Sequence, residues 1–332
     1  MDRSGAVGGG AEGPLTQSLA RVEWPTLAVA AAIYGAFAAL TWWYAILPWW
    51  LVLPAGAYVV CWHGSLQHET VHGHPTPWRG VNEALVFPSL WLWLPYRVYR
   101  ESHLIHHRDE MLTCPVSDPE TYYVTPERWR TMHRIHRALR RAYNTVLGRL
   151  AAGPPVAFAR LLNAETARLR SGDRSHLLPW ALHLAGAGTT IVWAVGICGI
   201  PFVEYVLFFA YPGVSLTLLR SFAEHRAAMP IDQRTAVVET GPVLGVLYLY
   251  NNLHALHHSV PREPWYALPG LYRNRRDELL ASNAGYLFRG YWEVVLRYFV
   301  WPKEEPAHPF FGAGGWTAPA APPTPVSPRR AA

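Results

Sequence analysis

The stretch VAAAIYGAFAAL, residues 29–40, contains no charged side chain and shows no polar face at helical spacing. A helix that is apolar on every side is buried either in a large core or in a lipid bilayer. This stretch lies within residues 22–78, which contain no Lys or Arg, and residues 175–219 form a second segment of this kind. Because roughly 20 apolar residues cross a bilayer core, both segments are predicted to span a membrane.

Each of these segments is long enough for two spans joined by a tight turn. The predicted spans are residues 26–46 and 49–67, which meet at Leu47-Pro48, and residues 177–198 and 201–220, which meet at Gly199-Ile200-Pro201. The expected fold is therefore all-α, with four transmembrane helices in two hairpins. A soluble helical protein with two very hydrophobic core hairpins is the alternative, but such core helices usually keep a polar face.

Basic residues are concentrated outside the predicted spans. Residues 79–174 carry fifteen Arg and nine acidic residues. By the positive-inside rule, both termini and the 68–176 loop face the cytoplasm, most simply at a bacterial inner membrane. The net charge of +6 is explained by this topology and by anionic membrane lipid, so no nucleic-acid partner is expected. The turn between the first two spans carries an aromatic belt for the opposite interface, formed by Trp42, Trp43, Trp49 and Trp50.

The ordered part of the chain is expected to be one unit, residues 23–310, between disordered tails at residues 1–22 and 311–332. Three segments of this unit are not expected to cross the membrane. Residues 84–96 are too short to span and are predicted to be re-entrant or interfacial. Residues 126–149 suit a basic amphipathic helix on anionic lipid, with a solvated helix face or a docking surface for an acidic electron donor as alternatives. Residues 284–301 suit an interfacial helix interrupted by charges.

Three histidine clusters follow the predicted spans: HETVH (68–72), ESHLIHH (101–107) and NNLHALHH (251–258). Residues at i, i+3 and i+4 of a helix share one face, and the adjacent pair in HxxHH diverges by ~100°. Such a triplet can therefore supply two neighbouring metal ions. A ninth imidazole follows the fourth span. The candidate ligands are His68, His72, His103, His106, His107, His225, His254, His257 and His258.

The ligand set narrows the choice of metal. Imidazole suits zinc, copper, iron and nickel. Nine nitrogens are too many for one zinc ion, and two iron ions with an open position for O2 fit this number best. The three cysteines, Cys61, Cys114 and Cys198, form no CxxC pair, which argues against a disulfide framework or an iron–sulfur cluster.

The order HETVH, HLIHH, HALHH over a four-span chain resembles the membrane fatty acid desaturase superfamily, whose members are histidine-box diiron desaturases and hydroxylases. RSFAEHRA (220–227) and NNLHALHHSVPREPWYALP (251–269) are similar to later motifs of its bacterial members. The resemblance covers roughly residues 25–305. It implies that the nine histidines bind two iron ions in a cytoplasmic helical cap, and that O2 and two electrons are used to oxidise an unactivated C–H bond.

The resemblance also implies the partners. The substrate would be a fatty acyl chain carried by a lipid, by coenzyme A or by an acyl carrier protein. Because the chain carries no HPGG-type haem domain and no cysteine-based redox module, a separate donor such as ferredoxin or rubredoxin, with its reductase, is expected to deliver electrons. Two alternatives stay open: a hydroxylase or ketolase of alkanes, fatty acids or carotenoids on the same diiron site, and a metal-binding membrane transporter.

Carboxylates are expected beside ligating imidazoles, because they fix the tautomer and the orientation of the ring. Some relatives carry an Asn one turn before the ligand that matches His225, where this chain has Ser221. A water at Ser221, or the Asn251 or Asn252 side chain, is expected to take that place. The candidates for support are Glu69, Glu101, Asp109, Ser221, Glu224 and Asn251. The motifs DPE (118–120) and PWY (264–266) suggest no role from sequence.

Overall fold

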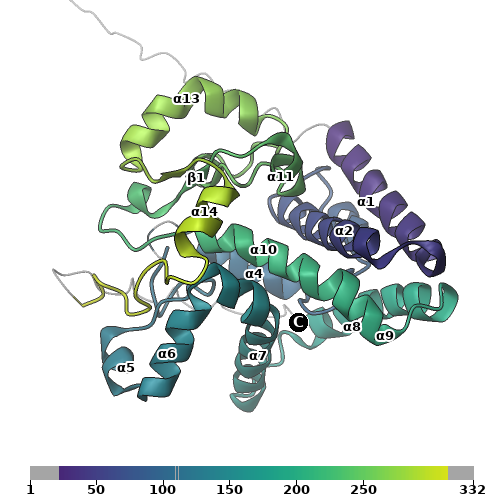
Figure 1. Cartoon of the computed structure of the whole chain (residues 1–332), viewed down its shortest axis with the longest axis horizontal. Coiled ribbons are helices and arrows are strands. Elements are labelled where there is room, and N and C mark those ends of the chain that lie inside the picture. Colours follow the sequence, from purple (N-terminus) through teal and green to yellow (C-terminus); the bar gives the residue numbers. More distant parts are fainter. Residues whose placement is uncertain (1–21, 109, 111, 313–332) are drawn as a thin grey trace, which may run out of the picture.

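The computed structural model describes residues 22–108, 110 and 112–312. The predicted tails, 1–22 and 311–332, lie almost wholly outside this part of the chain. Helices dominate, so the fold class is confirmed in its main feature (Figure 1). The described residues also form a two-stranded parallel sheet, in which β1 (Val237–Val238) pairs with β2 (Leu287–Phe288), and two isolated β-bridges.

Two helical hairpins stand where the apolar segments predicted them. The first consists of α1 (Trp24–Trp42) and α2 (Trp49–Val71). In the second, α8 (Leu177–Ile191) continues through a π-helical stretch to Ile197, and α9 (Phe202–Tyr205) continues through another, Val206–Ala210, into α10 (Tyr211–Glu224). Gly199, at φ +71°, makes the second turn. The hydroxyl of Tyr44 donates to Glu204 at 2.5 Å and so ties the two turns together.

Three helical stretches are long and apolar enough to cross a membrane: Trp24–Trp42, Leu177–Ile197 and Phe202–Glu224. The helix α2 is not among them, although it has 23 residues. Its second half carries polar side chains, and fifteen of its residues are buried inside the protein. A fourth span at residues 49–67 therefore stays a prediction. The four tryptophans of the expected aromatic belt are 53–66% exposed at the first turn.

The cap is built from the remaining helices, most of them short. Its elements, in chain order, are α3 (Arg79–Leu85), α4 (Tyr96–His106), α5 (Pro126–Thr131), α6 (Arg134–Tyr143), α7 (Val146–Arg170), the 3-10 turn Ile231–Arg234, α11 (Pro242–Leu247), α12 (His254–Ser259), α13 (Leu268–Ser282) and α14 (Tyr291–Tyr298). Of these, α5, α6, α13 and α14 lie to the left of the hairpins in Figure 1. Between Leu85 and Tyr96 the chain is not helical, and its Ser89 amide donates to the Gly186 carbonyl of α8 at 3.2 Å.

Two predicted interfacial helices are wrong in their extent. Residues 126–149 form three elements rather than one, because His133 and Thr145 each start a new helix with a side chain that accepts a backbone N–H. Within residues 284–301, helix begins only at Tyr291, because the preceding segment pairs as β2 and Gly290 adopts φ +110°.

The helices α2 and α10 approach closely at Gly213. A Cβ added there would lie 2.6 Å from two side-chain carbons of Val60 in α2, whereas one added at Gly35 of α1 would meet no atom within 4 Å.

We therefore expect Gly213→Ala to destabilise the protein by about 1–3 kcal/mol, because a core that is already packed must shift to admit a methyl group. Gly35→Ala is the matched control and should unfold at or above the wild-type temperature. Thermal unfolding of the purified protein in detergent measures both. Equal unfolding temperatures for the two variants would contradict this packing.

Candidate metal centre

Every candidate ligand lies at or near the end of a helix. His68 is in the last turn of α2 and His72 caps that helix, while His103 and His106 are in the last turn of α4 and His107 caps it. His225 follows directly after α10, and the short helix α12 carries the remaining three. Because the carbonyl end of a helix favours positive charge, the convergence of α2, α4 and α10 suits cations.

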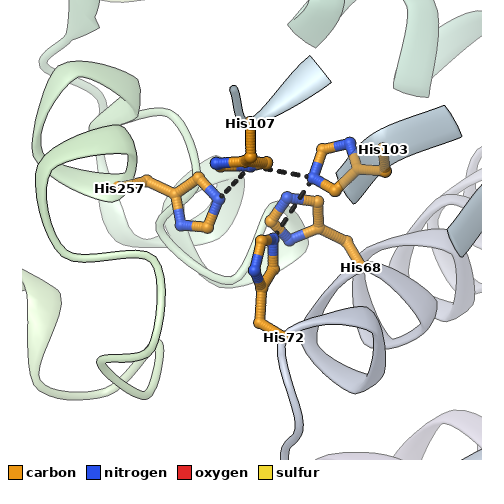
Figure 2. Close-up of side chains that lie close together, drawn as sticks. All are labelled: His68, His72, His103, His107 and His257. Carbon is orange, nitrogen blue, oxygen red and sulfur yellow. Dashed lines mark hydrogen bonds between the residues drawn. The ribbon is translucent and has the colours of Figure 1, made fainter. Parts of the chain in front are cut away.

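The nine imidazoles form two groups. In each group, one nitrogen per ring lies within 4.8 Å of the others. The five-histidine group consists of His68, His72, His103, His107 and His257, and its rings converge in Figure 2. The four-histidine group consists of His106, His225, His254 and His258. The adjacent histidines of each HxxHH motif thus belong to different groups.

The distances between nitrogens match those of ligands around one ion. In the five-histidine group, Nε2 of His103 lies 3.2 Å from Nε2 of His72 and 3.0 Å from Nε2 of His107. In the four-histidine group, Nε2 of His225 lies 3.0 Å from Nε2 of both His106 and His254. Two nitrogens that bind one ion at ~2.1 Å and ~90° are ~3.0 Å apart. Both groups therefore fit a metal ion, and their binding of one stays a prediction.

The two groups are in direct contact. The rings of His107 and His258 stack with centroids 4.3 Å apart and planes 16° from parallel. His107 belongs to the five-histidine group and His258 to the four-histidine group. The two groups therefore adjoin, so two ions bound by them would be neighbours rather than occupy separate sites.

Two carboxylates orient the histidines of α4. Asp118 Oδ1 accepts from Nδ1 of His106, and Glu120 Oε1 accepts from Nδ1 of His103, each at 3.0 Å. Asp118 is itself held by the backbone N–H groups of Thr113 and Glu120, each at 2.9 Å. These contacts keep the proton on Nδ1 and direct the Nε2 lone pair into the site. They give the DPE motif the role that the sequence did not suggest.

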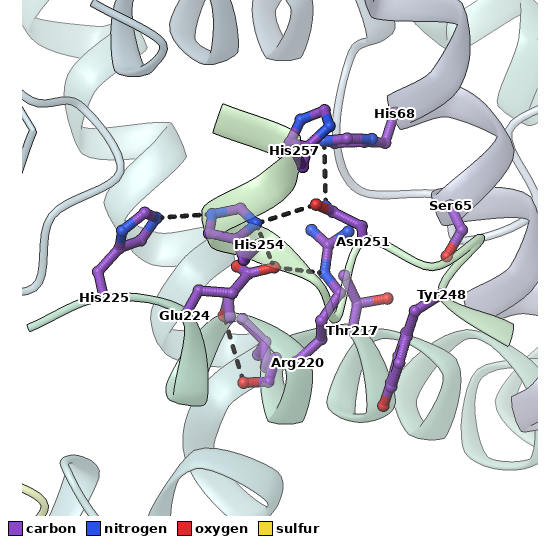
Figure 3. A network of polar contacts seen from close by, with 12 residues as sticks. Ser65, His68, Thr217, Arg220, Glu224, His225, Tyr248, Asn251, His254 and His257 are labelled. Atoms are coloured by element: carbon purple, nitrogen blue, oxygen red, sulfur yellow. Dashed lines mark hydrogen bonds and ion pairs between the residues drawn. The ribbon is translucent and has the colours of Figure 1, made fainter. Parts of the chain in front are cut away.

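A third support joins the two groups (Figure 3). Asn251 Oδ1 accepts from Nδ1 of His254 at 2.9 Å, and its Nδ2 lies 3.1 Å from Nε2 of His68. Oε1 of Glu224 lies 3.4 Å from Nδ1 of His254 and 3.0 Å from Nε of Arg220. The expected roles of Asn251 and Glu224 thus have contacts to support them, whereas Arg220 was not anticipated.

The other expected supports lie elsewhere. Glu69 Oε1 is 3.9 Å from Nδ1 of His68, and its Oε2 accepts the Trp265 amide of the PWY motif at 3.2 Å. The Ser221 hydroxyl donates within α10 to the Leu218 carbonyl, at 3.2 Å. Glu101 is wrong as a support, because it lies 3.2 Å from His176, outside both groups. Asp109 lies outside the described residues.

Electrostatics favour neutral imidazoles at most of these positions. Burial, reinforced by neighbouring imidazoles, holds the pKa of His225, His254 and His257 well below the usual range. The neutral ring is the form that binds metal. At His106, burial also lowers the pKa, but the carboxylates of Asp118 and Glu120 outweigh it and raise the pKa to about 9. An ion bound at Nε2 of His106 would therefore displace a proton at neutral pH.

The model of one protein family, described as fatty acid desaturase, matches residues 41–290. The match covers more than half of the chain and includes all nine histidines. The chain belongs to the fatty acid desaturase family. The superfamily predicted from the sequence is therefore confirmed, and its bacterial type stays a prediction. A comparison with curated proteins found no match.

Membership makes the chain an oxidoreductase with apolar helices suited to a membrane. The family implies a fatty acyl substrate and suggests a diiron centre. The two histidine groups are compatible with that centre in the number and chemistry of their donors.

We expect Asp118→Asn to weaken metal binding at the four-histidine group by ~10–100-fold, because an amide directs an imidazole less firmly than a carboxylate does. Competition with a chelator of known affinity, followed by metal analysis, measures the change. Glu127→Gln is a suitable control because that side chain is 67% exposed on α5. Unchanged affinity in Asp118→Asn would show that the contact does not orient a ligand.

Proposed function

We propose that this member of the desaturase family is an oxygen-dependent diiron membrane enzyme that oxidises an unactivated C–H bond of a fatty acyl chain, and that it is a fatty acid desaturase. The observation that carries the proposal is the pair of adjoining histidine groups, with five imidazoles in one and four in the other. Zinc sites usually have four ligands, often with thiolates. Neither group contains a cysteine.

In this proposal the five-histidine group and the four-histidine group each hold one iron ion. Bound there, the iron supplies the redox chemistry that couples reduction of O2 to oxidation of the acyl chain. The overall desaturation consumes O2, two electrons and two protons, removes two hydrogens from adjacent carbons and releases two waters. A separate donor such as ferredoxin or rubredoxin, with its reductase, supplies the electrons.

The protein's own residues supply orientation and exclusion of water. Asp118, Glu120 and Asn251 fix the rings of three different histidines. Five of the nine side chains are buried, with His68, His103 and His257 only 1–2% exposed, and the other four are partly exposed. A dry site strengthens electrostatic interactions and suppresses side reactions with water. A displacement of the reacting atoms by ~1 Å changes the reaction rate greatly. Ligands held rigidly are therefore needed if one carbon of the acyl chain is to be oxidised in preference to its neighbours.

The nearest alternative is a hydroxylase or ketolase acting on alkanes, fatty acids or carotenoids at the same site. It would add an oxygen atom, whereas desaturation removes two hydrogens.

A metal transporter is the third candidate. Transporters place ligands near the bilayer midplane, whereas here His225 follows the end of α10 and His72 caps α2. We also propose that both termini and the histidine cap face the cytoplasm of a bacterial inner membrane.

We expect cells that express this chain together with a ferredoxin and its reductase to accumulate acyl chains lighter by two hydrogens, as measured by mass spectrometry of total lipid. Acyl chains heavier by one oxygen would instead establish the hydroxylase.

The purified protein should hold about two iron ions. Zinc, or a single ion per chain, would contradict the diiron proposal.

We expect His257→Ala to abolish product formation and to lower bound iron, because it removes a nitrogen from the five-histidine group. His133→Asn is the matched control, since His133 is an exposed residue that caps α6 and Asn preserves the cap. Wild-type turnover in His257→Ala would overturn the assignment of ligands.

A further inference from the structure

A cavity of about 530 Å³ lies in the cap, away from both histidine groups. Its walls come from α5, α6 and α7, together with Tyr122 and Pro306. No role in the oxidation chemistry accounts for it. Its volume suits a headgroup rather than a single water.

The charge that lines this cavity is of one sign. Arg128, Arg140 and Arg160, one from each helix, line it with His136, and no Asp or Glu does. Nearby arginines that do not line the cavity form ion pairs: Arg130 pairs with Glu127 at 3.2 Å, and Arg141 pairs with Glu305 at 2.8 Å. Burial, together with repulsion from Arg160 and Arg128, lowers the pKa of Arg140. The lining thus carries positive charge that no carboxylate in the wall balances.

A fourth guanidinium stands behind the wall. Arg149 is 6% exposed, and its guanidinium lies 4.3 Å from the ring centre of Tyr143 and 5.7 Å from that of Tyr122. Both rings line the cavity. Nε and Nη2 of Arg149 have no hydrogen-bond partner in the described part of the chain. Burying a charge is costly, and an anion in the adjoining cavity would offset that cost beyond what the aromatic rings supply.

The remaining lining is apolar. Met132, Leu139 and Val156 line the cavity beside the arginines. Leu139 is 61% exposed and Ile135, on the same helix, is 59% exposed. A basic helix surface with exposed aliphatic side chains is typical of segments that lie on a membrane surface. The ligand that matches this lining carries an anionic group joined to an apolar part.

We propose that this cavity binds the phosphate group of an anionic membrane phospholipid. Guanidinium groups recognise phosphate by paired hydrogen bonds, and three of them converge here from separate helices. The aliphatic rim contacts the carbons next to the headgroup. Arg160 also donates to the Thr121 carbonyl at 2.9 Å, in the segment whose Asp118 and Glu120 hold His106 and His103. The bound lipid would therefore brace the segment that orients two candidate ligands.

The test is direct binding of lipid to the full-length protein in phosphatidylcholine nanodiscs that contain a small fraction of fluorescent phosphatidylglycerol. The test variant is the double substitution Arg140→Gln/Arg160→Gln. The control is Arg130→Gln/Arg134→Gln, which removes the same charge from α5 and α6 at residues that do not line the cavity. Inorganic phosphate is added in a parallel series as a soluble competitor. None of these measurements depends on catalytic activity.

We expect the cavity variant to bind phosphatidylglycerol about tenfold more weakly than wild type and the control variant less than twofold more weakly. Equal weakening in both variants would mean general attraction between surface charge and lipid, and would overturn the proposal. Displacement of the lipid by millimolar inorganic phosphate would overturn the lipid as ligand and make the site one for soluble phosphate. Wild-type binding in the cavity variant would exclude the site altogether.

Discussion

The structure depends on holding nine imidazoles close together and oriented, with most of them neutral, at the meeting point of several helix ends. Rings that approach to 3.0–3.2 Å between nitrogens would repel one another if they were protonated. Burial disfavours protonation at most positions. Apolar packing brings α2 and α10 together, since Val60 and Val214 belong to one core. The side chains of Asp118, Glu120 and Asn251 then orient His106, His103 and His254. Their oxygens accept from Nδ1 of these three rings, which leaves Nε2 of each ring facing the site.

The helix α2 connects the polar histidine site to the apolar helices of the hairpins. Its first half packs among the other helices of the hairpins through residues such as Val52, Val59 and Val60, and its last turns carry His68 and Glu69. The polar end of α2 keeps it from resembling a membrane span by composition. It nevertheless has a larger share of buried residues than the other three long helices of the hairpins. The surrounding helices supply the apolar exterior, and α2 supplies the position of the first two histidines.

The hairpins and all nine clustered histidines could be predicted from the sequence, because apolar length and i, i+3, i+4 spacing are local signals. Helix breaks at His133 and Thr145 were missed because each depends on a single side-chain cap within a continuous basic pattern. Asp118 and Glu120 were recognised only as part of a motif, since their partners are twelve and seventeen residues away and no periodicity connects them. Arg220 resembles an ordinary basic residue at the end of a span until its contact with Glu224 is seen.

The splitting of adjacent histidines between the two groups has a consequence for how this centre can vary. His106 and His107, and likewise His257 and His258, are joined by one peptide unit, which holds their Cα atoms ~3.8 Å apart. Covalent geometry therefore limits the distance between the two groups. A displacement of α4 or α12 would move candidate ligands of both groups together. An insertion or deletion of a single residue within either motif would therefore displace a candidate ligand of each group at once.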